Sequence, residues 1–250
     1  FIIRKKKYDN ILVFATSPLL QALIGVFISK IFKVKLTIWV QDLWPHSLTA
    51  TGHIKNKYLL GIVNYLVNYI YKNSNTILVQ SESFVNEIKK YKLNKNIIYL
   101  PNPSEIFSNN KKSEITFNID KFNIVYAGNI GTVQSIETIV EAANLLKHNS
   151  KIQFHIFGNG KNFKIIKKLI MKREIDNIKI YGKINNIFIK DIFNKSDALI
   201  FCLKQDYLLN KTIPAKLQTY MSIGKPIVAS VDGESAEIIE TSNCGLSSAS

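Results

Sequence analysis

Short apolar runs alternate with longer segments of helical spacing along most of the chain. The run 11–15 is continuous in apolar residues, which is typical of a strand buried on both faces of a parallel sheet, and 35–40 is the next largely apolar run. The segments at about 18–32 and 56–72 carry apolar residues at helical spacing. This alternation of strand and helix predicts an α/β fold built in layers.

One polar stretch breaks the alternation. Residues 104–120 are rich in Asn, Ser and Lys and have no clean period, which indicates a connection between domains. The alternation resumes after it with apolar runs that predict further strands, at 122–127, 152–157, 178–181, 198–203 and 227–229. We therefore expect an α/β domain over 1–104, a connection over 105–120 and a second α/β domain over 121–250.

Both domains are expected to be truncated. The chain starts at Phe1 without an initiator Met, and it ends at Ser250 just after a Cys-Gly-Leu that is typical of the start of another strand.

The uncharged run at 11–29 is long enough to raise the question of a membrane span. Ser17-Pro18 interrupts it, and the part before this pair is rich in strand formers while the part after it has helical spacing. A strand, a proline turn and a helix therefore explain the run better than a span does.

The net charge of +15 in 250 residues favours acidic partners, such as phosphorylated substrates, an anionic membrane surface or nucleic acid. The lysines are scattered along helix faces and the aromatic residues fall at core positions, which disfavours nucleic acid but keeps it as an alternative. Cys202 and Cys244 lie far apart in apolar contexts and predict reduced core residues. We expect a cytoplasmic protein that lies on the inner face of a membrane, without a cofactor or a metal ion.

The stretch 212–237 predicts a loop, a short helix from Pro214, a stop at Gly224 and a buried strand. Lys211 and Lys216 flank the predicted helix start, and no acidic residue lies near it in the sequence. Because a helix N-terminus carries partial positive charge, this pattern predicts a site for an external anion. The alternative is that these lysines are only solvated.

Three strand-to-helix turns marked by Gly or Pro fall in the second half of the chain, at 128–131, 158–161 and 211–216. Parallel α/β sheets bind ligands at the carboxyl ends of their strands, so these turns are expected to share one rim. Glycine allows close approach of backbone N–H groups to a ligand. We expect the ligand to be a nucleotide diphosphate.

Several segments resemble retaining GT-B glycosyltransferases of the GT4 type, and most of all the branch that transfers amino sugars in O-antigen or capsule synthesis. They are QDLWPHSL (41–48), LPNP (100–103), VYAGNIGTVQSIETIVEAANLL (125–146), FHIFGNGK (154–161) and PAKLQTYMSIGKPIVASVDGESAEII (214–239). The resemblance implies two Rossmann-like domains, with a nucleotide sugar on the second and the acceptor on the first. It implies transfer to a polyprenyl-linked or other glycan acceptor, with a UDP-sugar favoured as donor.

Residue by residue, the resemblance implies catalytic roles for Asp42 and Lys216, and acceptor-side roles for Ser17 and His46. It implies donor-binding roles for Gly128, Asn129, Gly131, Gly158, Gly160, Lys161, Lys204, Pro214, Ala215 and Thr219.

One position departs from the family pattern. Many members carry two glutamates eight positions apart, and here these positions hold Lys211 and Thr219. Thr219 can hydrogen-bond a ribose hydroxyl but loses a charge-assisted contact of about 1–3 kcal/mol. An inactive remnant is therefore the alternative to an active transferase.

Simpler structural roles remain open at several of these positions. Asp42 could cap the helix that follows it, and Ser81 is a plausible helix cap. His155 lies in mid-strand, which is more typical of a satisfied core histidine than of a catalytic base. Lys204 could be either a sugar contact or a solvated loop residue.

Overall fold

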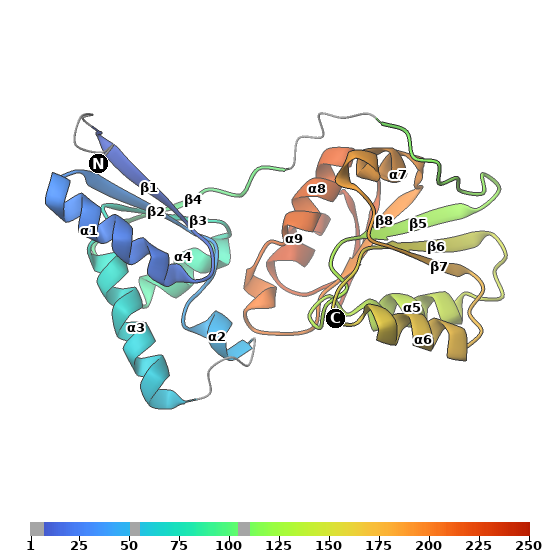
Figure 1. Cartoon of the computed structure of the whole chain (residues 1–250), viewed down its shortest axis with the longest axis horizontal. Helices are drawn as coiled ribbons and strands as arrows, with labels where there is room; N and C mark the ends of the chain where they lie inside the picture. Colours follow the sequence, from blue (N-terminus) through green and yellow to red (C-terminus); the bar gives the residue numbers. More distant parts are fainter. Residues whose placement is uncertain (1–7, 51–55, 105–110) are drawn as a thin grey trace. The chain divides into compact units, whose positions relative to one another are not determined.

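The computed structural model describes residues 8–50, 56–104 and 111–250 (Figure 1). The chain divides into two compact units. Unit 1 holds the chain up to Asn102 together with Asp206–Thr212, and unit 2 holds Pro103–Gln205 and Ile213–Ser250. The domain limits given above, 1–104 and 121–250, stay a prediction, and residues 105–110 of the expected connection lie outside the described residues.

Unit 1 contains a four-stranded parallel sheet in the order β1-β2-β3-β4. Its strands are β1 (Asn10–Ala15), β2 (Lys35–Val40), β3 (Thr76–Val79) and β4 (Asn96–Tyr99). Its helices are α1 (Ala22–Phe32), α2 (His46–Ala50), α3 (Lys57–Lys72) and α4 (Glu82–Lys89), with 3-10 turns η2 (Leu19–Gln21) and η4 (Leu209–Lys211). The expected strand, turn and helix at 11–29 are confirmed. Of the helices in the described part of the chain, none combines the length and the apolar character that crossing a bilayer requires.

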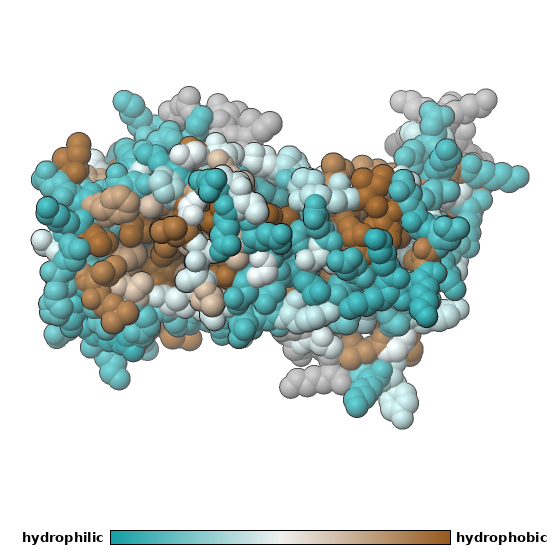
Figure 2. All heavy atoms as spheres, turned by 180° about the vertical axis from the view of Figure 1, so that it is seen from behind, coloured by the Kyte–Doolittle hydropathy of each residue, from teal (hydrophilic) through white to brown (hydrophobic). Residues whose placement is uncertain are grey.

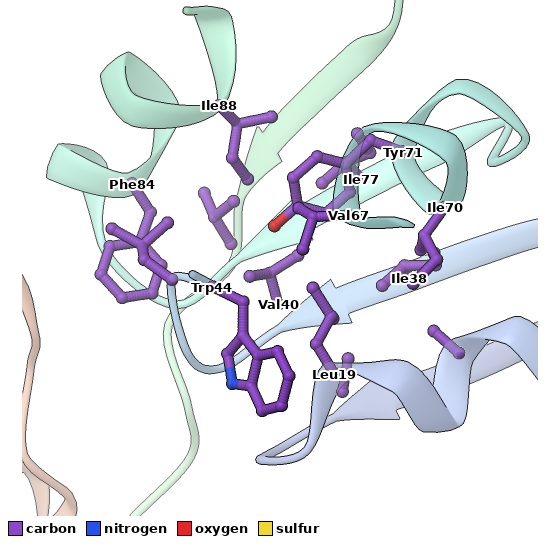
Figure 3. Close-up of a cluster of buried hydrophobic side chains, with 14 of the residues drawn as sticks. Leu19, Ile38, Val40, Trp44, Val67, Ile70, Tyr71, Ile77, Phe84 and Ile88 are labelled. Carbon is purple, nitrogen blue, oxygen red and sulfur yellow. The ribbon is translucent and has the colours of Figure 1, made fainter. Parts of the chain in front are cut away.

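The core of unit 1 lies on one face of this sheet. Ile38 and Val40 of β2 pack there against Val67, Ile70 and other residues of α3 (Figure 3). The period-2 pattern of β2 sends these side chains to one face, and the helical period of α3 meets them with a matching stripe. Helices α1 and α4 supply the rest of this layer.

The other face of the same sheet carries apolar side chains that are partly exposed. Phe14 is 50% exposed and meets the ring of Trp39 edge-on, with the ring centroids 5.3 Å apart. Apolar atoms reach the molecular surface in patches among polar ones (Figure 2). Exposed apolar side chains also occur on the outer sides of α1 and α3.

Unit 2 contains a six-stranded parallel sheet in the order β10-β9-β8-β5-β6-β7. Its strands are β5 (Phe122–Ala127), β6 (Ile152–Phe157), β7 (Ile178–Gly182), β8 (Ala198–Cys202), β9 (Ile227–Ser230) and β10 (Gly245–Ser248). The strands β5, β6 and β8 are predominantly apolar and are buried nearly throughout, as a parallel sheet covered on both faces requires.

Helices cover both faces of this sheet. They are α5 (Ile136–Leu145), α6 (Phe163–Lys172), α7 (Ile189–Lys195), α8 (Ala215–Ile223) and α9 (Glu234–Thr241), with the 3-10 turn η3 (Asn186–Phe188). Figure 1 shows α5 and α6 together on one side of the strands β5–β7, and α7 and α8 on the other. Both units thus have the layered parallel architecture of Rossmann-like domains.

The expected cap position of Ser81 is confirmed, but the cap hydrogen bond expected of its side chain is wrong. Ser81 is the residue before α4, but its hydroxyl makes no cap hydrogen bond among the described residues. It donates instead to the carbonyl oxygen of Lys211, 2.5 Å away. This partner is 130 residues distant in sequence, so no local pattern could indicate it.

Candidate functional site

Unit 2 has a cavity of about 760 Å³ at the carboxyl ends of its central strands. Five segments line it: the turns after β5, β6 and β7, helix α7, and the first turns of α8. The lining residues are Ala127, Gly128, Asn129, Phe157, Gly158, Asn159, Gly160, Lys183, Ile184, Asn186, Ile189, Phe193, Ala215, Lys216, Thr219 and Tyr220. The volume falls in the range of about 300–1,000 Å³ that small-molecule sites occupy.

The turns after β5 and β6 lock together at the floor of this cavity. A β-carbon on Gly158, whose φ is +144°, would lie 1.8 Å from the carbonyl oxygen of Gly128. A β-carbon on Gly160 would lie 2.5 Å from the carbonyl oxygen of Ile130. The N–H of Ile130 donates to the carbonyl oxygen of Asn159 at 2.9 Å. Only glycine fits at Gly158 and Gly160, so the two backbones can lie side by side beneath a ligand.

Helix α8 begins at Ala215, directly after Pro214, and ends at Gly224 in the left-handed conformation with φ +74°. The expected stop at Gly224 is confirmed. The first turn of α8 holds no acidic residue, and its N-cap residue, Pro214, offers no side-chain cap. The N-terminal N–H groups of this nine-residue helix therefore give the cavity wall partial positive charge.

Lys216 lies in that first turn with a partly buried side chain. Its Nζ lies 3.7 Å from the ring centroid of Tyr126, a cation–π contact. Burial lowers the pKa of the Lys216 ammonium to about 7. The hydroxyl of Tyr126 donates to the carbonyl oxygen of Asn129 at 2.5 Å, so the same ring supports the lysine and the turn after β5. An anion beside Nζ would favour the charged form of Lys216.

None of the described residues that line the cavity is acidic, and two of them, Lys183 and Lys216, are lysines. Together with the N-terminal N–H groups of α8, these lysines suit an anionic ligand. The N–H groups of Gly128, Gly158 and Gly160 already donate within the protein, so the glycine turns contribute close approach of the backbone. The arrangement suits a diphosphate in particular, because donors converge from separate segments.

The structure brings most of the predicted donor-side residues to one cavity. Those that line it are Gly128, Asn129, Gly158, Gly160, Ala215, Lys216 and Thr219. Pro214 precedes them at the start of α8.

Four predicted donor-side residues do not line the cavity: Pro214, Gly131, Lys161 and Lys204. Gly131 is buried, and its N–H donates to Oε1 of Gln134 at 3.1 Å. Lys161 and Lys204 are exposed and are absent from the described lining of the cavity. Lining the cavity does not establish a role, so the donor-binding roles of all these residues stay predictions.

The expectation that Lys211 belongs to the same anion site is wrong. Lys211 lies in unit 1, where its Nζ is 2.8 Å from Oε1 of Glu87. Glu87 is 5% exposed and also accepts hydrogen bonds from Lys90 and from the Tyr207 hydroxyl, each at 2.8 Å. Burial alone would raise the pKa of Glu87, but these donors lower it to about 2. The acidic partner that the local sequence lacks is therefore supplied from a residue 124 positions away.

The predicted acceptor-side residues lie in unit 1. The hydroxyl of Ser17 accepts a hydrogen bond from Nε1 of Trp44 at 2.9 Å, which ties the turn after β1 to the turn after β2. His46 is exposed, and its ring lies 6.1 Å from that of Tyr207. Asp42 is partly exposed in the turn after β2. The structure thus gathers Ser17 and the segment 42–46 at the carboxyl ends of neighbouring strands.

Comparison with known proteins agrees with this arrangement. The family model described as "Glycosyl transferases group 1" matches residues 107–250, which is more than half of the chain and includes the whole cavity. The chain belongs to the group 1 glycosyltransferase family. Its relatives, similar in sequence, include the probable glycosyltransferase WbjE of Pseudomonas aeruginosa and the putative colanic acid biosynthesis glycosyl transferase WcaI of Escherichia coli K12.

WbjE is 23% identical over 94% of this chain and 59% of its own length, and WcaI is 24% identical over 68% of this chain and 44% of its own. This group 1 glycosyltransferase chain therefore spans about half the length of the curated relatives it matches.

Solved structures show the same fold. Anabaena HepE, solved with UDP and glucose, superposes with a TM-score of 0.69 over 97% of this chain and 64% of its own, at 15% identity. The pneumococcal O-GlcNAc transferase GtfA, solved with UDP and GlcNAc, gives a TM-score of 0.62 over 91% of this chain and 43% of its own, also at 15% identity. The expected GT-B class, two Rossmann-like α/β domains, is confirmed.

The structure adds residues of this group 1 glycosyltransferase chain that the sequence patterns did not single out. Lys183 and Asn186 line the cavity after β7. Gly182 at the end of that strand has φ +80° and marks a fourth strand-end turn, so it carries the signal used for the other turns. Tyr220 closes the wall from α8, and its hydroxyl accepts the N–H of Ala127 at 3.0 Å.

His155 is a satisfied core histidine, as expected. It is 2% exposed, with Nδ1 2.9 Å from the Tyr181 hydroxyl and Nε2 3.0 Å from Oδ1 of Asn123. Burial lowers the pKa of its imidazole to about 4, with nearby lysines acting in the same direction. Its hydrogen bonds assign it to the packing of unit 2.

Proposed function

We propose that this chain is part of a retaining glycosyltransferase of the GT4 type that transfers a sugar from a nucleotide-diphosphate sugar to a glycan acceptor in surface polysaccharide synthesis. A UDP-sugar is the favoured donor and a polyprenyl-linked glycan the favoured acceptor. The observation that carries the proposal is the cavity of unit 2, where two closely packed glycine turns, the start of α8 and Lys216 converge with no acidic residue in the described lining.

The chemistry follows from charge. Cleavage of the anomeric C–O bond leaves negative charge on the departing diphosphate and positive character on the sugar. Hydrogen-bond donors that are already in position before the reaction stabilise this developing negative charge more than they stabilise the ground state. In this proposal, Lys216 and the N–H groups of Ala215 and Lys216 hold the diphosphate. Gly128 and Gly158 let it lie against the backbone.

Lys216 has a further property that fits this role. In the free site its pKa of about 7 leaves it near half-protonated at neutral pH. A bound diphosphate would raise the pKa of Lys216, so binding of the nucleotide sugar would favour protonation of Nζ. The lysine would then be fully charged when the diphosphate leaves.

We assign the remaining contacts with the nucleotide sugar to its ribose and to its transferred sugar. Thr219 lines the cavity two helix positions after Leu217 and offers a hydroxyl to the ribose. Asn129, in the turn after β5, offers an amide to the sugar. Roles for Gly131, Lys161 and Lys204 at this site belong to the same proposal.

On the acceptor side, we assign Asp42 to the reacting hydroxyl, and Ser17 and His46 to acceptor contacts. Their support is their common position at the strand ends of unit 1 and the hydrogen bond between Ser17 and Trp44. Substituting Asp42 by Asn should abolish transfer without changing UDP affinity.

We also assign the outer sides of α1 and α3 to an anionic membrane surface on the cytoplasmic side. Neither helix contains an acidic residue. Phe27 is 65% exposed on α1, and Tyr58 and Tyr65 are 88% and 70% exposed on α3. Aromatic side chains beside lysines such as Lys30 suit the interface of an anionic bilayer.

Sedimentation with vesicles tests this assignment. Phosphatidylglycerol-containing vesicles should retain the chain, neutral phosphatidylcholine vesicles should retain much less, and Phe27→Ser with Tyr65→Ser should abolish retention. Equal retention by both vesicle types would contradict the assignment.

Calorimetric titration with UDP tests the donor site. Lys216→Ala should weaken binding about tenfold or more, because a charge-assisted hydrogen bond is worth about 1.5–3 kcal/mol. Lys168→Ala, which changes an exposed lysine on α6, is the matched control and should bind like the parent chain. An unchanged affinity in Lys216→Ala would remove the diphosphate role. Parallel titrations with GDP and ADP would show whether uracil is the preferred base.

A further inference from the structure

A second cavity, of about 260 Å³, lies within unit 1. Three segments that are distant in sequence line it: the turn after β2 with Leu43, Trp44 and His46, helix α3, and the end of α4. Trp44 is 7% exposed and is fixed through its Nε1 hydrogen bond to Ser17. The cavity therefore has a rigid aromatic wall.

Tyr71 supplies an unpartnered hydroxyl to this cavity. The side chain is 0% exposed, and its Oη has no hydrogen-bond partner among the described residues. Figure 3 shows the hydroxyl directed away from α3 toward the side where Val40 and Trp44 lie. Burial and the nearby Tyr91 raise the pKa of Tyr71, so the group stays a neutral hydroxyl that both donates and accepts. A buried polar group without a partner is unfavourable unless a ligand or a water satisfies it.

The carboxylate and the ammonium that line the cavity form an ion pair, so their charges cancel. The carboxylate of Glu87 and the ammonium of Lys90 lie 2.8 Å apart. Asn64 of α3 also lines the cavity and accepts a hydrogen bond from the Tyr91 hydroxyl at 2.8 Å. A charged ligand would compete with the ion pair, whereas hydroxyl groups can extend the existing network on both sides.

Size and composition narrow the ligand further. The cavity is smaller than the range of about 300–1,000 Å³ that typical ligand sites occupy, so it suits one small ring. Aromatic side chains from Trp44, Tyr71 and Tyr91 provide apolar surface, and the carboxylate, ammonium and amide provide hydrogen-bonding partners. This mixture matches a sugar, whose ring has apolar C–H faces and a rim of hydroxyls.

We infer that the unit 1 cavity binds a single uncharged sugar ring, with the Tyr71 hydroxyl as a hydrogen-bonding partner at its base. The inference rests on the proposed function in one respect: in a glycosyltransferase such a ring would belong to the glycan acceptor. It names Tyr71, Trp44, Glu87 and Asn64 as residues that select the acceptor. All four lie outside the set predicted from the sequence.

Tryptophan fluorescence gives a direct test in the full 250-residue chain. The chain has two tryptophans, so Trp39→Phe leaves Trp44 as the only reporter. Titration with glucose and with N-acetylglucosamine should give a saturable change for at least one sugar, in the millimolar range expected of a single ring. Glycerol serves as a small polyol without a ring and should bind more weakly.

Two tyrosine variants identify the site. Tyr71→Phe keeps the ring and should weaken sugar binding about fivefold, as expected for one neutral hydrogen bond. Its melting temperature without sugar should not fall, because the deleted hydroxyl has no protein partner among the described residues. Tyr8→Phe alters an exposed hydroxyl elsewhere in unit 1 and should bind like the parent chain.

Three results would overturn the inference. They are no saturable change up to about 100 mM sugar, unchanged sugar affinity in Tyr71→Phe, and glycerol binding as tight as sugar binding. The first would leave water as the only occupant of the cavity. UDP titration of the same sample separates this inference from the proposed function. UDP binding without sugar binding would refute the unit 1 site alone, and sugar binding without UDP binding would refute the donor site alone.

Discussion

Replacing Gly158 by alanine should damage both the stability of unit 2 and the donor site proposed there. The new β-carbon would lie 1.8 Å from the carbonyl oxygen of Gly128, far inside van der Waals contact. Neither backbone can easily move. The N–H of Gly128 donates to the carbonyl oxygen of Phe157 at 3.0 Å, and the N–H of Gly158 donates to that of Gly182 at 2.7 Å.

The magnitude has two parts. Alanine at φ +144° is strained by about 1–3 kcal/mol, and forcing an extra carbon into a packed site costs about 1–3 kcal/mol more. The sum, about 4 kcal/mol, corresponds to a fall in melting temperature of about 8–16 °C for a chain of this size. Because the turns after β5 and β6 must separate, UDP affinity should fall by more than about tenfold.

Urea unfolding and UDP calorimetry on Gly158→Ala measure the two effects, and two other glycines serve as controls. Gly224 has φ +74°, but a β-carbon there would meet no described atom within 4 Å, so Gly224→Ala should lose only about 1–2 kcal/mol to backbone strain and keep UDP affinity. Gly61 lies in α3 with the same open surroundings, and Gly61→Ala should stabilise the chain by about 0.5–1 kcal/mol. If Gly158→Ala matched Gly224→Ala in both measurements, the interlocking of the turns would not matter as argued.

Three further predictions follow from single groups. UDP-glucose affinity should fall about tenfold between pH 6 and pH 8, because Lys216 with a pKa of about 7 loses its proton in the free site, and calorimetry on Lys216→Ala should show no such loss. Glu87→Ala should lower the free energy of unfolding at pH 7 by up to about 3 kcal/mol, since its pKa falls from 4.5 to about 2 on folding. That stability is present above pH 4.5 and is lost as the pH falls toward 2, so acid titration of the parent chain should reveal it and the variant should lack it. Tyr220→Phe should cost about 1–3 kcal/mol in urea unfolding, because the buried N–H of Ala127 loses the hydroxyl that accepts it, and a loss no larger than that of a surface variant would contradict that role.

The strands and most helices could be predicted from the sequence because their signals are local. The run 122–127 is predominantly apolar and forms β5 over those residues. Gly224 ends α8 because a left-handed residue is required there, and glycine adopts that conformation without strain. The position of the unit 2 cavity was also predictable, since parallel strands place all their carboxyl ends on one edge.

What could not be predicted depends on distant partners. Lys211 and Lys216 look equivalent in the sequence, yet Lys211 pairs with Glu87 in unit 1 and Lys216 lies over Tyr126 in unit 2. Ser81 stands at the cap position before α4, but its hydroxyl donates to a carbonyl oxygen that is 130 residues away in sequence. Tertiary packing decides which partner each of these side chains has, and the periodicity of apolar residues does not indicate it.

The assignment of residues 206–212 to unit 1 has a practical consequence for work with fragments of this protein. The chain leaves unit 1 after Asn102, returns for Asp206–Thr212 and leaves again before Ile213. A protease cut near residue 103 would therefore not free the two units as independent fragments. Expression of residues 1–102 alone would remove Tyr207 and Lys211 from Glu87 and leave a buried carboxylate with fewer donors, so fragments designed on a single boundary should be poorly soluble.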